Sequence, residues 1–498
     1  MNDNDKKTTE RDKALGDFLA EHARTGAVSF HMPGHKGAGF YEKNGFGTEM
    51  KRLADWDITE IAGADNLFQP ETVIRRTMQK YERLYQTRRS YLLINGSSAG
   101  IIAAILAAVP RGGRLLMARN CHKSVFNALY LGDIQPLYLH PQTDERYGVA
   151  GEVRASDVAA LLEREPQAAA VILASPNYYG ICSDIAAIAR VTHERGRLLI
   201  VDQAHGAHLK FFEEQQQSAA DSAPGEALRF PPAAESLGAD LVINSTHKTL
   251  ASFTQTAVLN VCSERIDLSL LEDRLQMVES SSPSYPLMAT LDINADILAA
   301  HKDRLVEEWS DNLSWFYGRA EHIAGLKLMK GRLMDPSKIN LDMSACGLDG
   351  DRLEQELMSA GIFPELVSGD IVMCMTGIGN TRSDYERLAA ALAALSERYG
   401  QRYGQADAND AAGRKAENGP APGKLSFHGL PQSREKIALS QAAGRVCAMS
   451  LIPYPPGIPL ACPGEELDAE TVAALLSLRR SGRKVIGVDE DMSVWVGK

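Results

Sequence analysis

Short apolar segments alternate with helical segments between residues 91 and 243, and this alternation limits the fold more than any other feature. The apolar runs, each of about the length of a strand, lie at residues 91–94, 114–118, 134–139, 170–174, 198–201 and 241–243. The helical segments between them lie at residues 99–109, 121–131, 155–165 and 185–195. Apolar strands separated by helices are typical of a mostly parallel sheet covered on both faces. The sequence therefore predicts an α/β fold whose large domain holds such a sheet.

The length of the chain indicates several domains, because 498 residues are too many for one hydrophobic core. Strand and helix patterns resume after residue 327, which is typical of a small α/β domain. Residues 213–232 are rich in Gln, Ala and Pro and interrupt the alternation, so we expect a surface excursion there. The expected divisions are an N-terminal segment at 1–90, a large domain at 91–300, a small α/β domain at 301–400, a linker at 401–423 and a C-terminal domain at 424–498.

Charge and cysteine content exclude several classes of protein. The net charge of −11 argues against nucleic acid or an anionic membrane as the main partner. The seven cysteines are scattered without a Cys-x-x-Cys pair, which indicates neither a disulfide framework nor a zinc site. No apolar run approaches the roughly 20 residues that cross a bilayer, and residues 1–13 lack the apolar core of a signal peptide. We therefore expect a cytoplasmic protein.

Three polar residues follow strands of the predicted sheet. Ser98 follows the run at 91–94, Asp202 ends the run at 198–201, and Lys248 follows the run at 241–243. Ligands of parallel sheets bind beyond the carboxyl ends of the strands, so we expect these side chains to meet at one edge. A lysine among small hydroxyl residues at that place suits a Schiff base to an aldehyde cofactor. The alternative for Lys248 alone is an ordinary surface lysine.

The residues around Lys248 suggest how such a cofactor is held. The turn at residues 96–99 opens a helix, and a helix N-terminus favours phosphate, although serines there also serve as helix caps. Asp202 either keeps a pyridine nitrogen protonated or caps the turn that follows it. His122 either stacks on a flat ring or caps the helix that it precedes. Ser245 and His247 lie close enough to Lys248 in sequence to touch the same phosphate.

Histidines occur in two short segments for which a metal site is one interpretation. His31 and His35 lie in a Pro-Gly segment at residues 31–37, with no acidic or cysteine partner at ligand spacing. His205 and His208 have the spacing of a zinc pair but lack a nearby glutamate base. We therefore predict no metal site, and we interpret residues 31–37 as a loop that anchors the N-terminal segment near an active site.

Seven motifs occur in an order that resembles one known family. They are HMPGHKG at 31–37, NGSS at 95–98, CHKS at 121–124, DQAHGAH at 202–208, STHKTL at 245–250, SPSYP at 282–286 and YPPGIP at 454–459. Together they resemble the Orn/Lys/Arg decarboxylases, which are pyridoxal-phosphate enzymes of fold type I. The resemblance extends over about residues 30–465. Some members carry tryptophan three residues after the aspartate; His205 at this position resembles the short, biosynthetic-type branch that includes arginine decarboxylase.

The resemblance implies a role for each motif. Lys248 forms the Schiff base with pyridoxal 5'-phosphate, Asp202 holds the pyridine nitrogen and His122 stacks on the ring. It also implies a homodimer or higher homo-oligomer with shared active sites. The implied cofactor-binding residues are Ser97, Ser98, Ala99, His122, Asp202, His205, Ser245, His247 and Lys248, with Ser281 and Ser282 reaching the cofactor of a neighbouring subunit.

The expected activity is decarboxylation of a basic amino acid. We rank arginine first, giving agmatine for polyamine synthesis, then lysine, then ornithine, and expect Lys248 or His122 to donate the proton. A guanidinium group favours a carboxylate partner, for which Glu465 is the first candidate and Asp65 the second. One alternative is an aminotransferase of the same fold, which would normally bind the substrate carboxylate with an arginine on a small-domain strand; the predicted strand at 371–375 has none, although Arg382 lies nearby. Another is a catalytically silent protein that binds the cofactor as a regulator.

Overall fold

A seven-stranded sheet forms the centre of the large domain in the computed structural model, which describes residues 24–144, 147–213, 228–403, 425–453, 458–480 and 482–498. The strands follow one another across the sheet in the order β2 (Arg89–Leu93), β10 (Ala257–Val261), β9 (Leu241–Asn244), β8 (Leu198–Asp202), β7 (Ala168–Ala174), β3 (Arg114–Ala118) and β4 (Gln135–Leu139). The pairs from β9 to β4 are parallel, and β10 runs antiparallel to both its neighbours. The predicted α/β fold with a mostly parallel sheet is confirmed.

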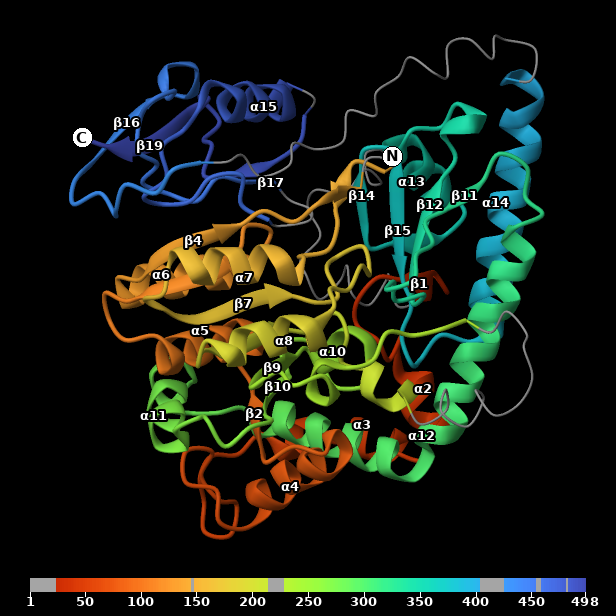
Figure 1. Ribbon diagram of the computed structural model, residues 1–498. Coiled ribbons are helices and arrows are strands. Elements are labelled where there is room, and N and C mark those ends of the chain that lie inside the picture. Colours follow the sequence, from red (N-terminus) through yellow and green to blue (C-terminus); the bar gives the residue numbers. More distant parts are fainter. Residues whose placement is uncertain (1–23, 145–146, 214–227, 404–424, 454–457, 481) are drawn as a thin grey trace, which may run out of the picture.

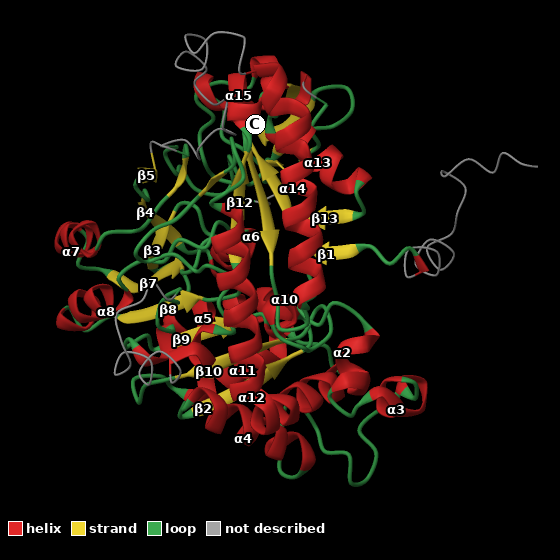
Figure 2. Cartoon of the chain, turned by 90° about the vertical axis from the view of Figure 1, so that its right-hand side faces the viewer, coloured by secondary structure: helices red, strands yellow, loops and turns green. Residues whose placement is uncertain are grey.

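Helices cover both faces of this sheet. Figure 2 shows α7 (Ala155–Arg164) and α8 (Ile185–Glu194) on one side, and α5 (Gly96–Ala108), α6 (Lys123–Gly132) and α11 (Leu268–Val278) on the other. Helix α5 lies directly on the sheet because Gly100 has no side chain: a Cβ there would come within 2.5 Å of the Leu93 side chain. This close approach sets the N-terminus of α5 just beyond the end of β2.

The long helix α12 (Tyr285–Ala320) leads from the large domain to the small one (Figure 1). The small domain has an antiparallel sheet in the order β11 (Lys327–Leu328), β12 (Lys338–Asp342), β15 (Ile371–Met375), β14 (Leu366–Ser368). Its helices are α13 (Gly350–Ser359) and α14 (Arg382–Tyr403). Near the start of the described chain, β1 (Val28–Phe30) pairs with β13 (Ile362–Pro364), so the N-terminal segment packs on the small domain.

Residues 425–498 form a C-terminal module with an apolar core of its own, built around residues such as Leu439, Leu451 and Leu475. It contains α15 (Ala469–Arg480) and two small sheets, which pair β16 (Arg434–Ala438) with β19 (Ser493–Gly497) and β17 (Ile452–Pro453) with β18 (Val485–Ile486). Figure 1 shows the module, in blue, beside the β4 edge of the large sheet. The shorter elements are α2 (Ala38–Lys43), α3 (Gly47–Met50), α10 (Thr246–Thr249), β5 (Thr143–Asp144) and β6 (Val149–Ala150).

The expected alternation of strands and helices did not include strand β10 or helix α4. Strand β10 is antiparallel and needs no crossover helix, so it falls outside the alternation of strands and helices. Helix α4 (Val73–Tyr85) is rich in charged residues, and its buried residues include Ile74, Met78, Tyr81 and Tyr85, which form one helical stripe. Most of the expected linker, residues 214–227 of the expected excursion and residues 454–457 lie outside the described residues.

Candidate active site

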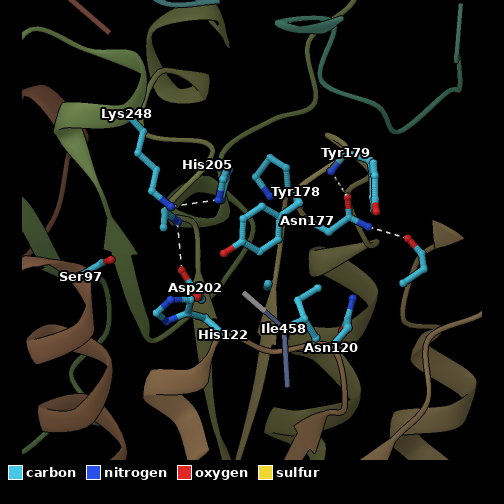
Figure 3. A pocket seen from close by; sticks show the side chains of 14 residues that line it. Ser97, Asn120, His122, Asn177, Tyr178, Tyr179, Asp202, His205, Lys248 and Ile458 are labelled. Atoms are coloured by element: carbon cyan, nitrogen blue, oxygen red, sulfur yellow. Dashed lines mark hydrogen bonds between the residues drawn. The ribbon is translucent and has the colours of Figure 1, made fainter. Parts of the chain in front are cut away.

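Lys248 lies in the short helix α10, just past the end of β9. Its Nζ is 2.9 Å from His205 Nε2 and 5.9 Å from the centre of the Tyr178 ring (Figure 3). An inner pocket contains Lys248 together with Ser97, His122, Asp202 and His205. The structure thus brings together the strand-end residues that the sequence placed at one edge of the sheet.

An outer pocket adjoins the inner one and shares Ser97, His122, Tyr178 and Lys248 with it. Its further lining residues include Ser98, His247, Gln255 and Glu365. Asp202 therefore belongs to the inner pocket alone. The first turn of α5 lines both pockets through Ser97.

The loop at residues 31–37 packs against α10. The Gly34 backbone N–H donates to the His247 carbonyl at 2.8 Å, and the Gly379 N–H donates to the Gly34 carbonyl at 3.0 Å. A Cβ at Gly34 would lie 2.5 Å from the Leu250 carbonyl oxygen, so only glycine permits this contact without a shift of the backbone. The loop joins the N-terminal segment to the Lys248 turn and to the small domain, as the sequence led us to expect.

Asp202 is buried at the end of β8. One carboxylate oxygen accepts a hydrogen bond from the Ala204 N–H at 3.1 Å. Burial raises the pKa of Asp202, and the nearby Lys248 ammonium and the Ala204 N–H act in the opposite direction. A cation placed against this carboxylate would therefore favour its ionised form.

The N-terminus of α5 has backbone donors without a side-chain cap. Its N-cap residue, Asn95, makes no capping hydrogen bond to the helix; the Asn95 amide donates instead to the Val278 carbonyl at 2.9 Å. Gly96 adopts a positive φ of 76° as the chain enters the helix. Ser97 and Ser98 face the outer pocket from this turn, and Ala99 is buried behind them. An uncapped helix N-terminus beside serine hydroxyls suits an anion such as phosphate.

Two further polar groups lie close to Lys248 in the sequence. The Ser245 hydroxyl is buried and has no hydrogen-bond partner among the described residues. The His247 ring lines the outer pocket and is held by its Nδ1, which donates to the Thr256 carbonyl at 2.7 Å. A buried hydroxyl without a partner is rare in proteins and indicates a missing ligand or water.

His122 has the capping role that the sequence left open, and its pocket position is compatible with the stacking role. As the N-cap of α6 its Nδ1 accepts from the Ser124 N–H at 3.3 Å, and its ring also lines both pockets near Asp202 (Figure 3). Burial, with the nearby charges of Lys248 and Lys123, lowers the pKa of His122 to about 3. The ring is therefore neutral at pH 7.

Burial of His247 predicts that acid destabilises the protein without cofactor. Its pKa is lowered from 6.5 to about 4, mainly by burial, so below pH 6.5 the unfolded chain takes up a proton that the folded chain excludes. The contribution of neutral His247 to the free energy of unfolding is complete above pH 6.5 and is lost as the pH falls toward 4. Between pH 6.5 and 5 the free energy of unfolding should fall by about 2 kcal/mol. Urea unfolding at both pH values measures it, and His247→Asn should lose less stability than the wild type over this range. An unchanged difference in the variant would contradict the assignment.

Besides Ala99 and Ser245, which are buried, four of the expected site residues do not line either pocket: Glu465, Asp65, Ser281 and Ser282. Glu465 is fully buried, with Oε2 2.9 Å from Arg119 Nη2. Asp65 accepts backbone hydrogen bonds from residues at the start of α4, where it acts as a helix cap. Ser281 and Ser282 are exposed on the surface of the single chain. The structure therefore places neither Glu465 nor Asp65 where a substrate guanidinium would approach Lys248.

Asn177, Tyr178 and Glu365 are among the pocket residues that the sequence analysis missed. Asn177 and Tyr178 follow strand β7, and the Tyr178 ring lies 4.5 Å from the His205 ring, measured between ring centres. The strand-end argument used for Asp202 would have found both. Glu365 lies in the short connection between β13 and β14, where no hydrophobic period marks it. Its pocket position depends on tertiary packing.

Family models match most of the chain. The model for the major domain of Orn/Lys/Arg decarboxylases matches residues 14–331, and the model for their C-terminal domain matches residues 420–493. The chain belongs to the Orn/Lys/Arg decarboxylase family. It is therefore a pyridoxal-phosphate-dependent amino-acid decarboxylase, and the aminotransferase alternative and the alternative of a silent regulator are set aside.

Individual relatives agree with this family. The chain is 32% identical to the uncharacterized protein YaaO of Bacillus subtilis, over 92% of this chain and 93% of that protein. It is 26% identical to arginine decarboxylase of Bacillus subtilis, over 95% of this chain and 94% of that enzyme. The lysine decarboxylase LdcF of Francisella novicida has the same fold, with a TM-score of 0.72 and 18% identity over 96% of this chain and 80% of that one. The resemblance to the short arginine decarboxylase branch is confirmed.

The pockets of this decarboxylase fit pyridoxal phosphate. The uncapped N-terminus of α5 and the unpaired Ser245 hydroxyl offer donors for the phosphate. Asp202 lines the inner pocket, where its carboxylate could pair with a pyridine nitrogen, and Lys248 lines both pockets. Among the described residues that form the two pockets, the lysines are the half-buried Lys248 and the exposed Lys123.

Proposed function

We propose that this decarboxylase converts arginine to agmatine and carbon dioxide as a step toward polyamines, with lysine and ornithine as poorer substrates. The observation that carries the proposal is Glu365, the one acidic side chain among the described residues of the outer pocket. Its Oε2 accepts from the Met32 N–H at 2.9 Å, which holds the carboxylate in place. A planar guanidinium binds a carboxylate through two parallel hydrogen bonds, whereas an ammonium cannot. The arginine decarboxylases among the relatives of similar length support the same substrate.

When bound, pyridoxal phosphate supplies a conjugated ring that accepts the electron pair left behind as carbon dioxide departs. Lys248 Nζ anchors it covalently, and the Asp202 carboxylate keeps its ring nitrogen protonated through a charged hydrogen bond. The donors at Ser97, Ser98 and Ser245 hold the phosphate. The first residues of α5 would thus hold the phosphate, and Asp202 at the buried end of β8 would hold the ring nitrogen.

His205 orients the amine of Lys248. Burial lowers the pKa of His205 well below 6.5, and the ring is neutral, so Nε2 accepts a hydrogen bond from Lys248 Nζ at 2.9 Å. Burial also lowers the pKa of Lys248, with Asp202 and Glu365 acting in the opposite direction. A lysine with a lowered pKa gives up its proton more readily than an ordinary lysine. We propose that Lys248 Nζ delivers the proton to the substrate carbon, and that His122, neutral at pH 7, lies against the face of the ring.

Glu365→Gln tests the substrate assignment. We expect the KM for arginine to rise about 10- to 100-fold, because the charged hydrogen bond is worth about 1.5–3 kcal/mol, with an unchanged cofactor absorbance. Carbon dioxide release from arginine, lysine and ornithine is measured side by side for the wild type and the variant. Glu308→Gln, which breaks an exposed ion pair on α12, is the matched control. Faster release from lysine or ornithine in the wild type would refute arginine, and an unchanged KM in Glu365→Gln would refute the role of Glu365.

A further inference from the structure

Arg119 is a buried cation that binds the C-terminal module. It follows the last residue of β3 and precedes Asn120, which lines the inner pocket, and its side chain is 1% exposed. Nη1 donates to the Pro459 carbonyl at 2.9 Å, and Nη2 donates to the Leu460 carbonyl and to Glu465 Oε2, both at 2.9 Å. All three acceptors belong to the module, so one side chain of the large domain holds a short segment of another domain.

The surroundings of this ion pair leave it little freedom. The guanidinium lies between the rings of Phe126 and Tyr138, at 5.1 and 5.5 Å from their centres. Glu465 Oε2 also accepts from the Cys462 N–H at 2.7 Å. A buried charge that loses its partner is strongly unfavourable, so neither side chain can leave the pair without a large cost in stability. The geometry of residues 459–465 relative to β3 is therefore tightly defined.

Ile458 connects this ion pair to the active site. It directly precedes Pro459, whose carbonyl Arg119 holds, and its half-buried side chain lines the inner pocket with Asn120 and His122 (Figure 3). The other thirteen lining residues belong to the large domain, between Ser97 and Lys248. The C-terminal module thus supplies the remaining part of the wall near the Asp202 end.

We propose that Arg119 and Glu465 are positioning residues that seat Ile458 against the cofactor pocket, so that the C-terminal module completes the wall that retains pyridoxal phosphate. Neither charged side chain lines the pocket: Arg119 acts through the carbonyls of Pro459 and Leu460, and Glu465 acts by pairing with Arg119. An apolar wall beside Asp202 excludes water from the ring nitrogen and strengthens its pairing with the carboxylate. The inference uses the cofactor of the family and is independent of which amino acid is the substrate.

Cofactor retention in three variants tests the proposal. Ile458→Ala removes the wall, Glu465→Gln removes the charge but keeps the size, and Arg119→Lys keeps the charge but loses the fork geometry. The dissociation constant of pyridoxal phosphate is measured by titrating the protein freed of cofactor and following the imine absorbance, and thermal unfolding is recorded in parallel. We expect each variant to weaken cofactor binding about tenfold. Ile458→Ala should leave the melting temperature unchanged, and Glu308→Gln should change neither quantity.

A double variant separates positioning from general stability. If Glu465 acts through Ile458, the two changes should not be independent. The double variant Ile458→Ala/Glu465→Gln should then raise the dissociation constant of the cofactor by less than the product of the two single increases. Unchanged cofactor affinity in Ile458→Ala would overturn the proposal. A lower melting temperature without weaker cofactor binding in Glu465→Gln and Arg119→Lys would also overturn it, because the pair would then be purely structural. The titration involves no amino-acid substrate, so failure of the arginine assignment leaves it unaffected.

Discussion

Lys248→Ala will lower kcat for decarboxylation by about 10⁴-fold or more, because it removes both the covalent anchor of the cofactor and the proposed proton donor. Two other lysines among the described residues are held by other partners: the buried Lys338 amine donates to Asp335, Ser337 and the His205 carbonyl, and the Lys36 amine donates to the carbonyls of His31 and Met375. The absorbance of the protein-bound imine should vanish, while phosphate contacts at α5 still allow weak cofactor binding. Steady-state carbon dioxide release and an absorbance spectrum measure both effects.

The control for this variant is Lys43→Ala, which removes an exposed lysine paired with Glu308. Its activity and spectrum should match those of the wild type. If Lys248→Ala kept more than a small percentage of wild-type turnover, another side chain would have to carry the chemistry.

Asp202→Asn should lower kcat about 100-fold, while the protein stays folded and keeps the absorbance of the protein-bound imine. The amide has nearly the size of the carboxylate but cannot stabilise a positive pyridine nitrogen, and the lost charged hydrogen bond is worth about 1.5–3 kcal/mol. The Ala204 N–H can still donate to the amide oxygen, so the turn after β8 is kept. The KM for the amino acid should change little, because Asp202 lines only the inner pocket, whereas Glu365, the proposed substrate partner, lines the outer pocket. Steady-state kinetics and the absorbance spectrum separate these effects.

Asp240→Asn is a matched control on the same sheet. Asp240 is also fully buried, but it lies at the opposite end of β9 and accepts from the Leu199 N–H at 2.8 Å. We expect it to lower the melting temperature and leave kcat unchanged. Equal losses of kcat in both variants would show that a buried carboxylate is needed only for folding.

Most strands and helices of the large domain were predictable, because most strand residues are apolar and the helices between the strands are of similar length. Strand β3 begins and ends at the expected residues, and so does β15 of the small domain. The strand-end rule then located Asp202 and Lys248 without any contact information, since a parallel sheet brings those ends to one edge. Strand β10 escaped the same reasoning because an antiparallel strand at that position follows no crossover helix.

Contacts between domains were not predictable from local pattern. Glu465 follows a Pro-rich segment and has the chemistry of a guanidinium partner, but the guanidinium that it meets belongs to Arg119 of the same chain. Glu365 has no periodic signal, and it reaches the outer pocket only because β13 pairs with β1 and β14 pairs with β15. Such positions depend on which distant segments pack together, and a single sequence does not encode this in its hydrophobic period.

Borohydride reduction of the protein with its cofactor tests the central claim most directly, because it converts the imine to a stable bond at the lysine that carries it. Digestion and mass spectrometry then identify the modified peptide. We predict one pyridoxyl group per chain, attached to Lys248, and none in Lys248→Ala. Label on another lysine such as Lys36 or Lys338, or no label in protein saturated with pyridoxal phosphate, would contradict it.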